Sequence, residues 1–460
     1  MYNRQLTYEL AVFTFVIHSK TNDGMKTWVS QSSPVVHDYI TFLVMCLASP
    51  LHISNPYIRG KAVQAIEVFV PLPEDKARTA EGRNKGHRLH PFFQHIANHD
   101  IACLELMPAI GRFWVDIETT GSHTQFYDKV SHVSNASCSR RGLIMLMVCY
   151  YDVMQFTFRF SCMHIMEYLW DIPAHRQAFI KWIAAGLDTP NAEDIRDELD
   201  QSSAHEVAGS DDVPFQLRFG ALVLSDILYH MEEAFKALEE LKQIQEGGNA
   251  QNQEEEDEDP ETAKRRNTEM AKWSLRAAKT VADMLSYLTN EEVIASLFLG
   301  EHLCSRTAEM LMSLLSQLVG KSSKKLKVTN MDEIGFKPRK LLLKVVKIFN
   351  NLANASEKIK RGKSAEDSTK QSAAAAADVH GEVSDPALSN PFLVAVVKEE
   401  RFFRIENFHR VPQVLKDPNF LAQNPASGLE TERFEVCRIL KLTSTCKKRL
   451  KLLKIVCFYF

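Results

Sequence analysis

The sequence is poor in the residues that interrupt regular helices. It has 18 Gly and 17 Pro among 460 residues, whereas Leu, Ala, Lys and Glu are common. This balance favours helices over sheets, and no segment of any length alternates with the period of a strand. With 45% apolar and 25% charged residues, the chain has the composition of a soluble globular protein with a large core. We therefore predict an all-α fold.

The short motifs that mark cofactor sites and catalytic centres are also missing. The chain has no Gly-rich phosphate loop, dinucleotide fingerprint, Gly-x-Ser-x-Gly elbow or His-Glu-x-x-His zinc motif. Its nine Cys include no Cys-x-x-Cys pair, which indicates reduced thiols in the cytoplasm or nucleus. We expect no cofactor and no catalytic residue, and the motifs alone indicate a scaffold.

The near-neutral net charge argues neither for nor against a nucleic-acid or membrane partner, and local features support neither. The net charge is −3, and the basic cluster at Lys321–Lys327 has no interleaved aromatics, which indicates a solvated helix end. Leu143–Phe160 is about long enough to span a bilayer, but Asp152, Gln155 and Arg159 would lie inside it at high cost. We expect no membrane span and no signal peptide.

Apolar stripes at helical spacing recur along the chain. Ser33-Pro34 and Asn55-Pro56 each place a capping residue before a Pro at the first helical position. Many short-linked helix pairs without a central bundle predict a solenoid, in which each pair buries its face on its neighbours, although no exact period of about 34 or 40 residues is visible. The helices predicted from these stripes are 36–47, 58–69, 104–117, 215–245, 273–288, 303–318, 341–352 and a helix–turn–helix over 392–415.

Three segments interrupt this pattern. Residues 131–163 are rich in Ser, Cys, Met and Phe without a helical stripe, so we interpret them as an atypical insert. Residues 246–262 form an acidic linker, and residues 358–388, with five consecutive alanines, form a second disordered insert.

Two polar groups suggest chemistry without fixing it. His95 and His99 are four residues apart and could share a zinc face on a helix, but no third ligand is evident. Polar residues on a loop and a helix surface are the simpler interpretation, so we predict no metal site. Asp116, Glu118 and Asp128 could supply carboxylates near His123, yet nothing in the sequence fixes their geometry.

The most unusual sequence motif in the chain is GSHTQFYDK at residues 121–129. It fits a catalytic loop, a helix junction or a family signature. We expect Gly121 to end the preceding helix in a left-handed conformation, and Phe126 and Tyr127 to anchor the next helix. The signature residues, structural or partner-contacting, are Gly121, Thr124, Gln125, Phe126, Tyr127, Asp128 and Lys129.

Together with five other segments, this motif makes the sequence resemble the core of the ubiquitin-chain elongation factors, which are the U-box ubiquitin conjugation factors. The resemblance covers most of residues 33–415. It rests on NPYIRGKAVQAIEVF (55–69), LMPAIGRFWVDIETTGSHTQFYDK (106–129), LWDIPAHRQAF (169–179), YLTNEEVIASLFLGEHLCSRTAEMLMSLLSQLVG (287–320), LKVTNMDEIGFKPRKLL (326–342) and NPFLVAVVKEERFFRIENFHRVPQVL (390–415).

The resemblance implies an elongated, armadillo-like helical core followed by a C-terminal U-box. In the family, the U-box docks a ubiquitin-conjugating enzyme without donating a catalytic residue and acts by positioning. The partners implied are that conjugating enzyme, ubiquitylated substrates, a segregase ATPase of the AAA type and proteasome shuttle factors.

The chain departs from the family pattern in three places. Residues 416–460 form an atypical tail with no Asp-Pro-Leu-Met-type U-box start, and residues 131–163 interrupt a helix that is continuous in the family. We also expect the family's variable N-terminal region to be missing, with only residues 1–32 as a variable segment. Our hypothesis is a truncated or mis-spliced product. An abundant transcript that carries both segments in frame would contradict it.

Two functions therefore remain open. In the first, the chain takes part in polyubiquitin chain elongation for proteasomal degradation, including the ER-associated pathway, within a ubiquitin ligase complex, with ubiquitin–ubiquitin transferase activity implied by the resemblance alone. In the alternative, it is a non-catalytic helical scaffold that binds partners of the ubiquitin pathway.

Overall fold

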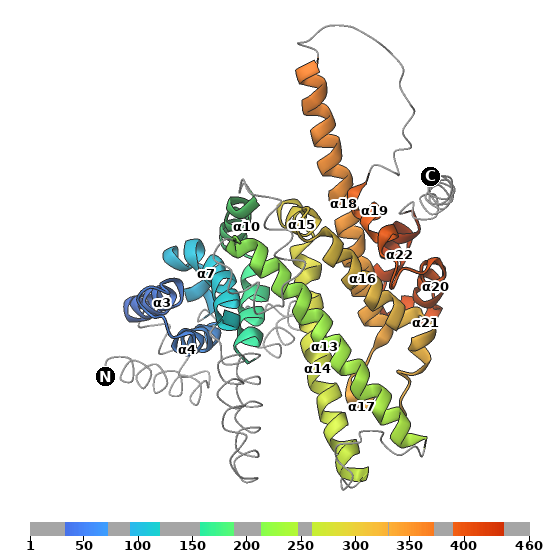
Figure 1. The fold of residues 1–460 in the computed structure, drawn as a ribbon. Coiled ribbons are helices and arrows are strands. Elements are labelled where there is room, and N and C mark those ends of the chain that lie inside the picture. The colour runs from blue at the N-terminus through green and yellow to red at the C-terminus, as the bar shows by residue number, and fades with distance from the viewer. Residues whose placement is uncertain are drawn as a thin grey trace, which may run out of the picture. The chain divides into compact units, whose positions relative to one another are not determined.

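The computed structural model describes residues 33–71, 93–119, 157–187, 213–246, 260–329, 331–371 and 390–436. All regular structure in these ranges is helical, which confirms the predicted all-α class (Figure 1). The chain divides into two compact units, residues 1–191 with 201–222 and residues 192–200 with 223–460. Within each unit, successive helices pack on one another as in a helical solenoid.

Helix α7 (Asp100–Thr119) lies at the centre of the first unit. It contacts α3 (Ser33–Ala48), α4 (Pro56–Glu67), α6 (Gln94–Ala97) and α10 (Pro173–Leu187). Its predicted apolar stripe, Leu106, Ile110, Phe113 and Ile117, is buried. Residues 157–170 are also helical and belong to this unit.

An aromatic cluster fills the core of the first unit. Phe219, in the first turns of α13 (Phe215–Gln245), lies edge-on to three rings. Its ring centroid is 5.9 Å from Trp114, 5.8 Å from Phe179 and 6.0 Å from Trp182. Such edge-to-face pairs add to the free energy of burying the rings, so Phe179 and Trp182 anchor the core of this unit.

The start of α4 follows directly from its sequence. The side-chain oxygen of Asn55 accepts a hydrogen bond from the Tyr57 backbone N–H at 2.9 Å, and Pro56 occupies the first helical position. The same arrangement begins α19 (Pro391–Lys398), where the Asn390 side chain accepts from Leu393 N–H at 3.1 Å. Each Asn side chain accepts from a backbone N–H of the first turn that has no partner within the helix. Each Pro lacks a backbone N–H, so it leaves no donor unsatisfied at the first helical position.

Helix α18 (Pro338–Gln371) is the centre of the second unit. It contacts α14 (Pro260–Leu288), α15 (Glu292–Leu299), α16 (Cys304–Val319), α19, α20 (Ile405–Leu415) and α22 (Ala426–Val436). The ring of Phe349 on α18 lies 5.4 Å from Phe392 and 5.3 Å from Phe434. The shorter elements are η3 (Lys321–Lys324), α17 (Met331–Ile334) and α21 (Pro418–Gln423).

The predicted disordered insert at 358–388 begins too early. Helix α18 continues through Gln371, and only residues 372–388 lie outside the described part. Residues 358–371 include four Lys together with Arg361, Ala365, Glu366 and Gln371, all of which are strong helix formers. They extend a helix that Val345 and Phe349 have already anchored by burial. In the acidic linker predicted at 246–262, residues 260–262 likewise belong to α14.

The predicted boundary between core and tail at residue 415 is also too early. Residues 418–436 form α21 and α22, and α22 packs on both α18 and α20. The reason is apolar contact, because the Phe434 ring stacks on Phe408 at 5.5 Å with 6° between their planes. Residues 437–460 lie outside the described part.

Candidate functional site

The signature motif at 121–129 lies outside the described part of the chain, which does not include residues 120–156. Gly121, Thr124, Gln125, Phe126, Tyr127, Asp128 and Lys129 are therefore still only predicted signature residues, and His123 is outside as well. The end of α7, which leads into this motif, is described.

The two carboxylates at the end of α7 are both engaged by buried arginines. Asp116 accepts from Arg59 Nη1 at 2.5 Å, and Glu118 accepts from Arg159 Nη2 at 2.6 Å. Arg59 is 2% exposed and also donates its Nε–H to the Leu47 carbonyl at 3.1 Å. Removing either carboxylate would break an ion pair of a buried cation, so these acids bind structural arginines and are poor candidates for the general base that the sequence allowed.

A second polar cluster fixes α4 to the helical residues 157–170. The Glu67 carboxylate accepts from Ser161 Oγ at 2.6 Å, and its other oxygen lies 3.0 Å from His164 Nδ1. His164 Nε2 lies 3.2 Å from the Pro71 carbonyl oxygen. Both ring nitrogens thus lie within hydrogen-bond distance of an oxygen, so the ring is held between α4 and the residue that follows Val70. Because Phe158 and Cys162 are buried beside this cluster, residues 157–163 belong to the core and not to an atypical insert.

His99 is a helix cap and not a metal ligand. Its Nδ1 accepts from the Ala102 backbone N–H at 3.2 Å, and its Nε2 lies 3.0 Å from the His37 carbonyl oxygen. This arrangement requires the neutral imidazole with its proton on Nε2, and burial lowers the pKa of His99 accordingly. The expectation of a surface residue is wrong for His99, which is 2% exposed.

No zinc face is formed by the described residues. In those ranges, no three His, Cys, Asp or Glu side chains come together as a metal site would require. Burial lowers the pKa of His95 on α6. His87 and His90 lie outside the described part.

The structure brings together one pair that the sequence did not suggest. Cys103 Sγ on α7 lies 3.5 Å from Nε2 of His175 on α10, 72 residues away. Burial raises the pKa of the Cys103 thiol and lowers the pKa of His175. The pair is therefore a neutral thiol beside a neutral imidazole, and not the thiolate–imidazolium pair that a cysteine nucleophile needs.

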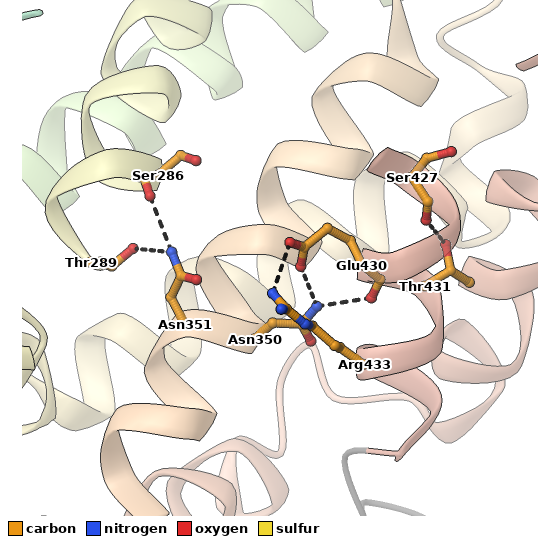
Figure 2. A network of polar contacts seen from close by, with 8 residues as sticks. All are labelled: Ser286, Thr289, Asn350, Asn351, Ser427, Glu430, Thr431 and Arg433. Carbon is orange, nitrogen blue, oxygen red and sulfur yellow. Dashed lines mark hydrogen bonds and ion pairs between the residues drawn. The ribbon is translucent and has the colours of Figure 1, made fainter. Parts of the chain in front are cut away.

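Figure 2 shows a buried polar network in the second unit, where α18 lies between α14 and α22. Asn350 donates to the Glu430 side chain at 2.8 Å and to its carbonyl oxygen at 2.9 Å. The adjacent Asn351 points to the end of α14, where it donates to Ser286 O at 3.1 Å and to Oγ1 of Thr289, the first residue after the helix, at 3.2 Å. Neighbouring amides thus tie α18 to two helices at once, and such buried networks fix one register.

The predicted basic cluster has a structural explanation. Lys324 is the last residue of η3, and its carbonyl oxygen accepts from Lys242 Nζ on α13 at 2.8 Å. Lys325 lies 3.9 Å from Glu239 on the same helix. Much of the candidate region 143–160 is outside the described part, and none of the described helices is long and apolar enough to cross a bilayer.

A comparison with known families gives this geometry a context. Residues 8–138 and 149–430 match the ubiquitin elongating factor core. The chain belongs to this family. The match to the elongating factor core begins at residue 8, inside the predicted variable segment 1–32. Of the predicted insert 131–163 it leaves out only residues 139–148, and it continues through α21 into α22.

Known proteins with similar sequences belong to the same group. The chain is 26% identical over 323 residues to the probable ubiquitin conjugation factor E4 of Arabidopsis thaliana, covering 69% of this chain and 25% of the relative. It is 25% identical over 357 residues to the E4 ubiquitin-protein ligase UFD2 of Saccharomyces cerevisiae (75% and 30%), and 24% identical over 357 residues to the ubiquitin conjugation factor E4 A of Bos taurus (75% and 28%). The chain thus spans 25% to 30% of the length of these relatives.

Proposed function

We propose that this elongating factor core takes part in extending polyubiquitin chains on proteins destined for the proteasome. The observation that carries the proposal is the family match over residues 8–138 and 149–430. The relatives named above are called ubiquitin conjugation factors and an E4 ubiquitin-protein ligase, and this activity is here carried over to the chain.

In this proposal the core acts by binding and positioning. A thioester carrier needs a reactive thiolate, but burial raises the pKa of all four described thiols. The pKa is raised to about 11 for Cys46 and Cys304, and it is raised for Cys103 and Cys162 as well. The described cysteines therefore favour a role in which other proteins carry the activated ubiquitin and this chain holds the reactants together.

The partners in this proposal are a ubiquitin-conjugating enzyme, ubiquitylated substrates, a segregase ATPase of the AAA type and proteasome shuttle factors, acting in the cytoplasm and nucleus. The AAA-type ATPase and the shuttle factors are the more specific part of the proposal. Binding of each can be measured separately with purified proteins.

A reconstituted reaction tests the function. Ubiquitin, activating enzyme, conjugating enzyme and a substrate with one or two ubiquitins are incubated with and without this chain. Longer ubiquitin chains in its presence are the expected result. Binding of the ubiquitylated substrate without extension would favour the non-catalytic scaffold, and neither binding nor extension would overturn both.

A further inference from the structure

We propose that a groove on the second unit binds a short extended peptide segment that carries a Lys or Arg beside an apolar anchor. The groove has a volume of about 500 Å³ and lies between α13, α16 and the turn after α19. Phe235 and Phe402 form its apolar surface, Ser313 and Gln317 lie on α16, and Glu232 and Glu240 lie on α13.

Ser313 is the feature of the groove that points to a ligand. This side chain is 6% exposed, lines the groove, and makes no hydrogen bond to any of the described residues. Gln317 follows it by one helical turn and also lines the groove without such a bond. The Ser313 hydroxyl oxygen is accessible from the groove and is not sealed in the core. A bound backbone with its own donors and acceptors would satisfy both groups.

The charges in the groove select a basic side chain. Two of the lining charges are already paired, because Arg401 lies 4.0 Å from Glu309 and Glu239 lies 3.9 Å from Lys325. Arg401 also lies over the ring of Phe402 at 4.8 Å. Glu232 and Glu240 form no ion pair within the described ranges and outnumber Lys236, which lies between them on α13. The unpaired charge is therefore negative, which favours a cationic ligand.

The dimensions fit a peptide of a few residues. From Glu232 to Gln243 the groove follows α13 for about 16 Å at about 1.5 Å per residue. About five extended residues cover that length at about 3.3 Å each. The apolar side chain would lie between Phe235 and Phe402, the backbone along Ser313 and Gln317, and the basic side chain beside Glu232 or Glu240.

A peptide library tests the groove in the full chain. The probe is a pool of synthetic nonapeptides with Phe, Leu or Met fixed at the centre and all other positions randomised. The expected result is enrichment of Lys and Arg next to the anchor on the wild-type chain. The variant E232K/E240K should bind the selected basic peptides about tenfold more weakly and should select Asp and Glu instead.

Two controls separate the groove from global effects. E261K/E269K makes the same change in net charge at two exposed positions of α14 and should leave the selection unchanged. S313A should weaken binding of the selected peptides without changing which charges are selected. No enrichment on the wild-type chain, or the same change of selection in E261K/E269K, would overturn the proposal. So would self-association of the chain that E232K/E240K abolishes, because the occupant would then be a second copy.

Discussion

The buried Arg159 and the partly exposed Glu118 form an ion pair with 2.6 Å between Nη2 and Oε2, although 41 residues separate them in the sequence. The Arg159 guanidinium also lies over the Trp114 ring, 5.4 Å from its centroid. The pair joins the end of α7 to a helix whose sequence gave no helical stripe. It therefore shows how far a local pattern can mislead when a helix is buried on several sides.

The first prediction concerns this ion pair. Glu118→Gln keeps the shape of the side chain but removes one ion pair of the buried Arg159, so the free energy of unfolding should fall by about 3 kcal/mol. Urea titrations followed by Trp fluorescence measure it, since Trp114 lies beside the pair.

Glu105→Gln is the matched control. Glu105 lies 3.6 Å from Arg112, with side chains 53% and 27% exposed, and an exposed pair contributes about 1 kcal/mol or less. Equal losses in the two variants would show that burial of Arg159 has no special energetic role.

The prediction of an atypical insert fails at residues 157–163, the described part of 131–163, for a physical reason. A surface helix shows its apolar stripe against polar residues on the other face, but a helix buried on several sides shows no contrast. Phe158, Cys162 and Met163 are buried, as are Arg159 and Ser161. The sequence therefore contained no stripe, and the partners of its polar residues, Glu67 and Glu118, lie far away in the chain.

Amphipathic helices were predictable, whereas the polar clusters were not. The stripes on α7, α13 and α18 matched their buried faces because period and burial are local properties of a helix. Contacts such as Cys103–His175 and Asn350–Glu430 join residues 72 and 80 positions apart. His99 did leave a local signal, because it directly precedes Asp100 at the start of α7, but we placed that start at Leu104.

A second prediction tests the close packing of α7 on α10. A Cβ added at Gly111 would overlap the six-membered ring of Trp182. Gly111→Ala should therefore lower the free energy of unfolding by about 1–3 kcal/mol, even though Ala is the better helix former by about 1 kcal/mol.

Gly428→Ala is the control for helix propensity. A Cβ at Gly428 in α22 would meet only the Leu421 side chain, at an ordinary 3.7 Å. This variant should be as stable as the wild type or slightly more stable. A stabilised Gly111→Ala variant would mean that α7 and α10 are not in close contact at this point.

The third prediction tests whether residues 416–436 belong to the core. Phe434 is 3% exposed and stacks on Phe408. Phe434→Ala should lower the free energy of unfolding by about 3–5 kcal/mol, measured by thermal or urea unfolding. Leu429→Ala on the same helix removes a side chain that is 54% exposed and should cost less than about 1 kcal/mol. A loss of less than about 1 kcal/mol at Phe434 would show that α22 does not belong to the core.

The last prediction concerns pH and the first unit. Burial lowers the pKa of His99 and of His175 below the ordinary value of 6.5. The unfolded chain therefore binds more protons than the folded chain below about pH 6.5. The stability associated with the neutral rings is fully present above that pH and is lost as the pH falls below it.

His99→Asn isolates one of these groups. Asn is a strong N-cap and can replace Nδ1 as the acceptor for the Ala102 N–H, yet it takes up no proton. The urea midpoint of this variant should fall less between pH 7 and pH 5 than that of the wild type. His37, Asp100 and His175 surround His99 and are unchanged in the variant, and His409→Asn, at an exposed position of α20, should retain the wild-type slope. If His99→Asn also retains that slope, proton uptake by His99 does not contribute to acid destabilisation, and the loss must come from other groups.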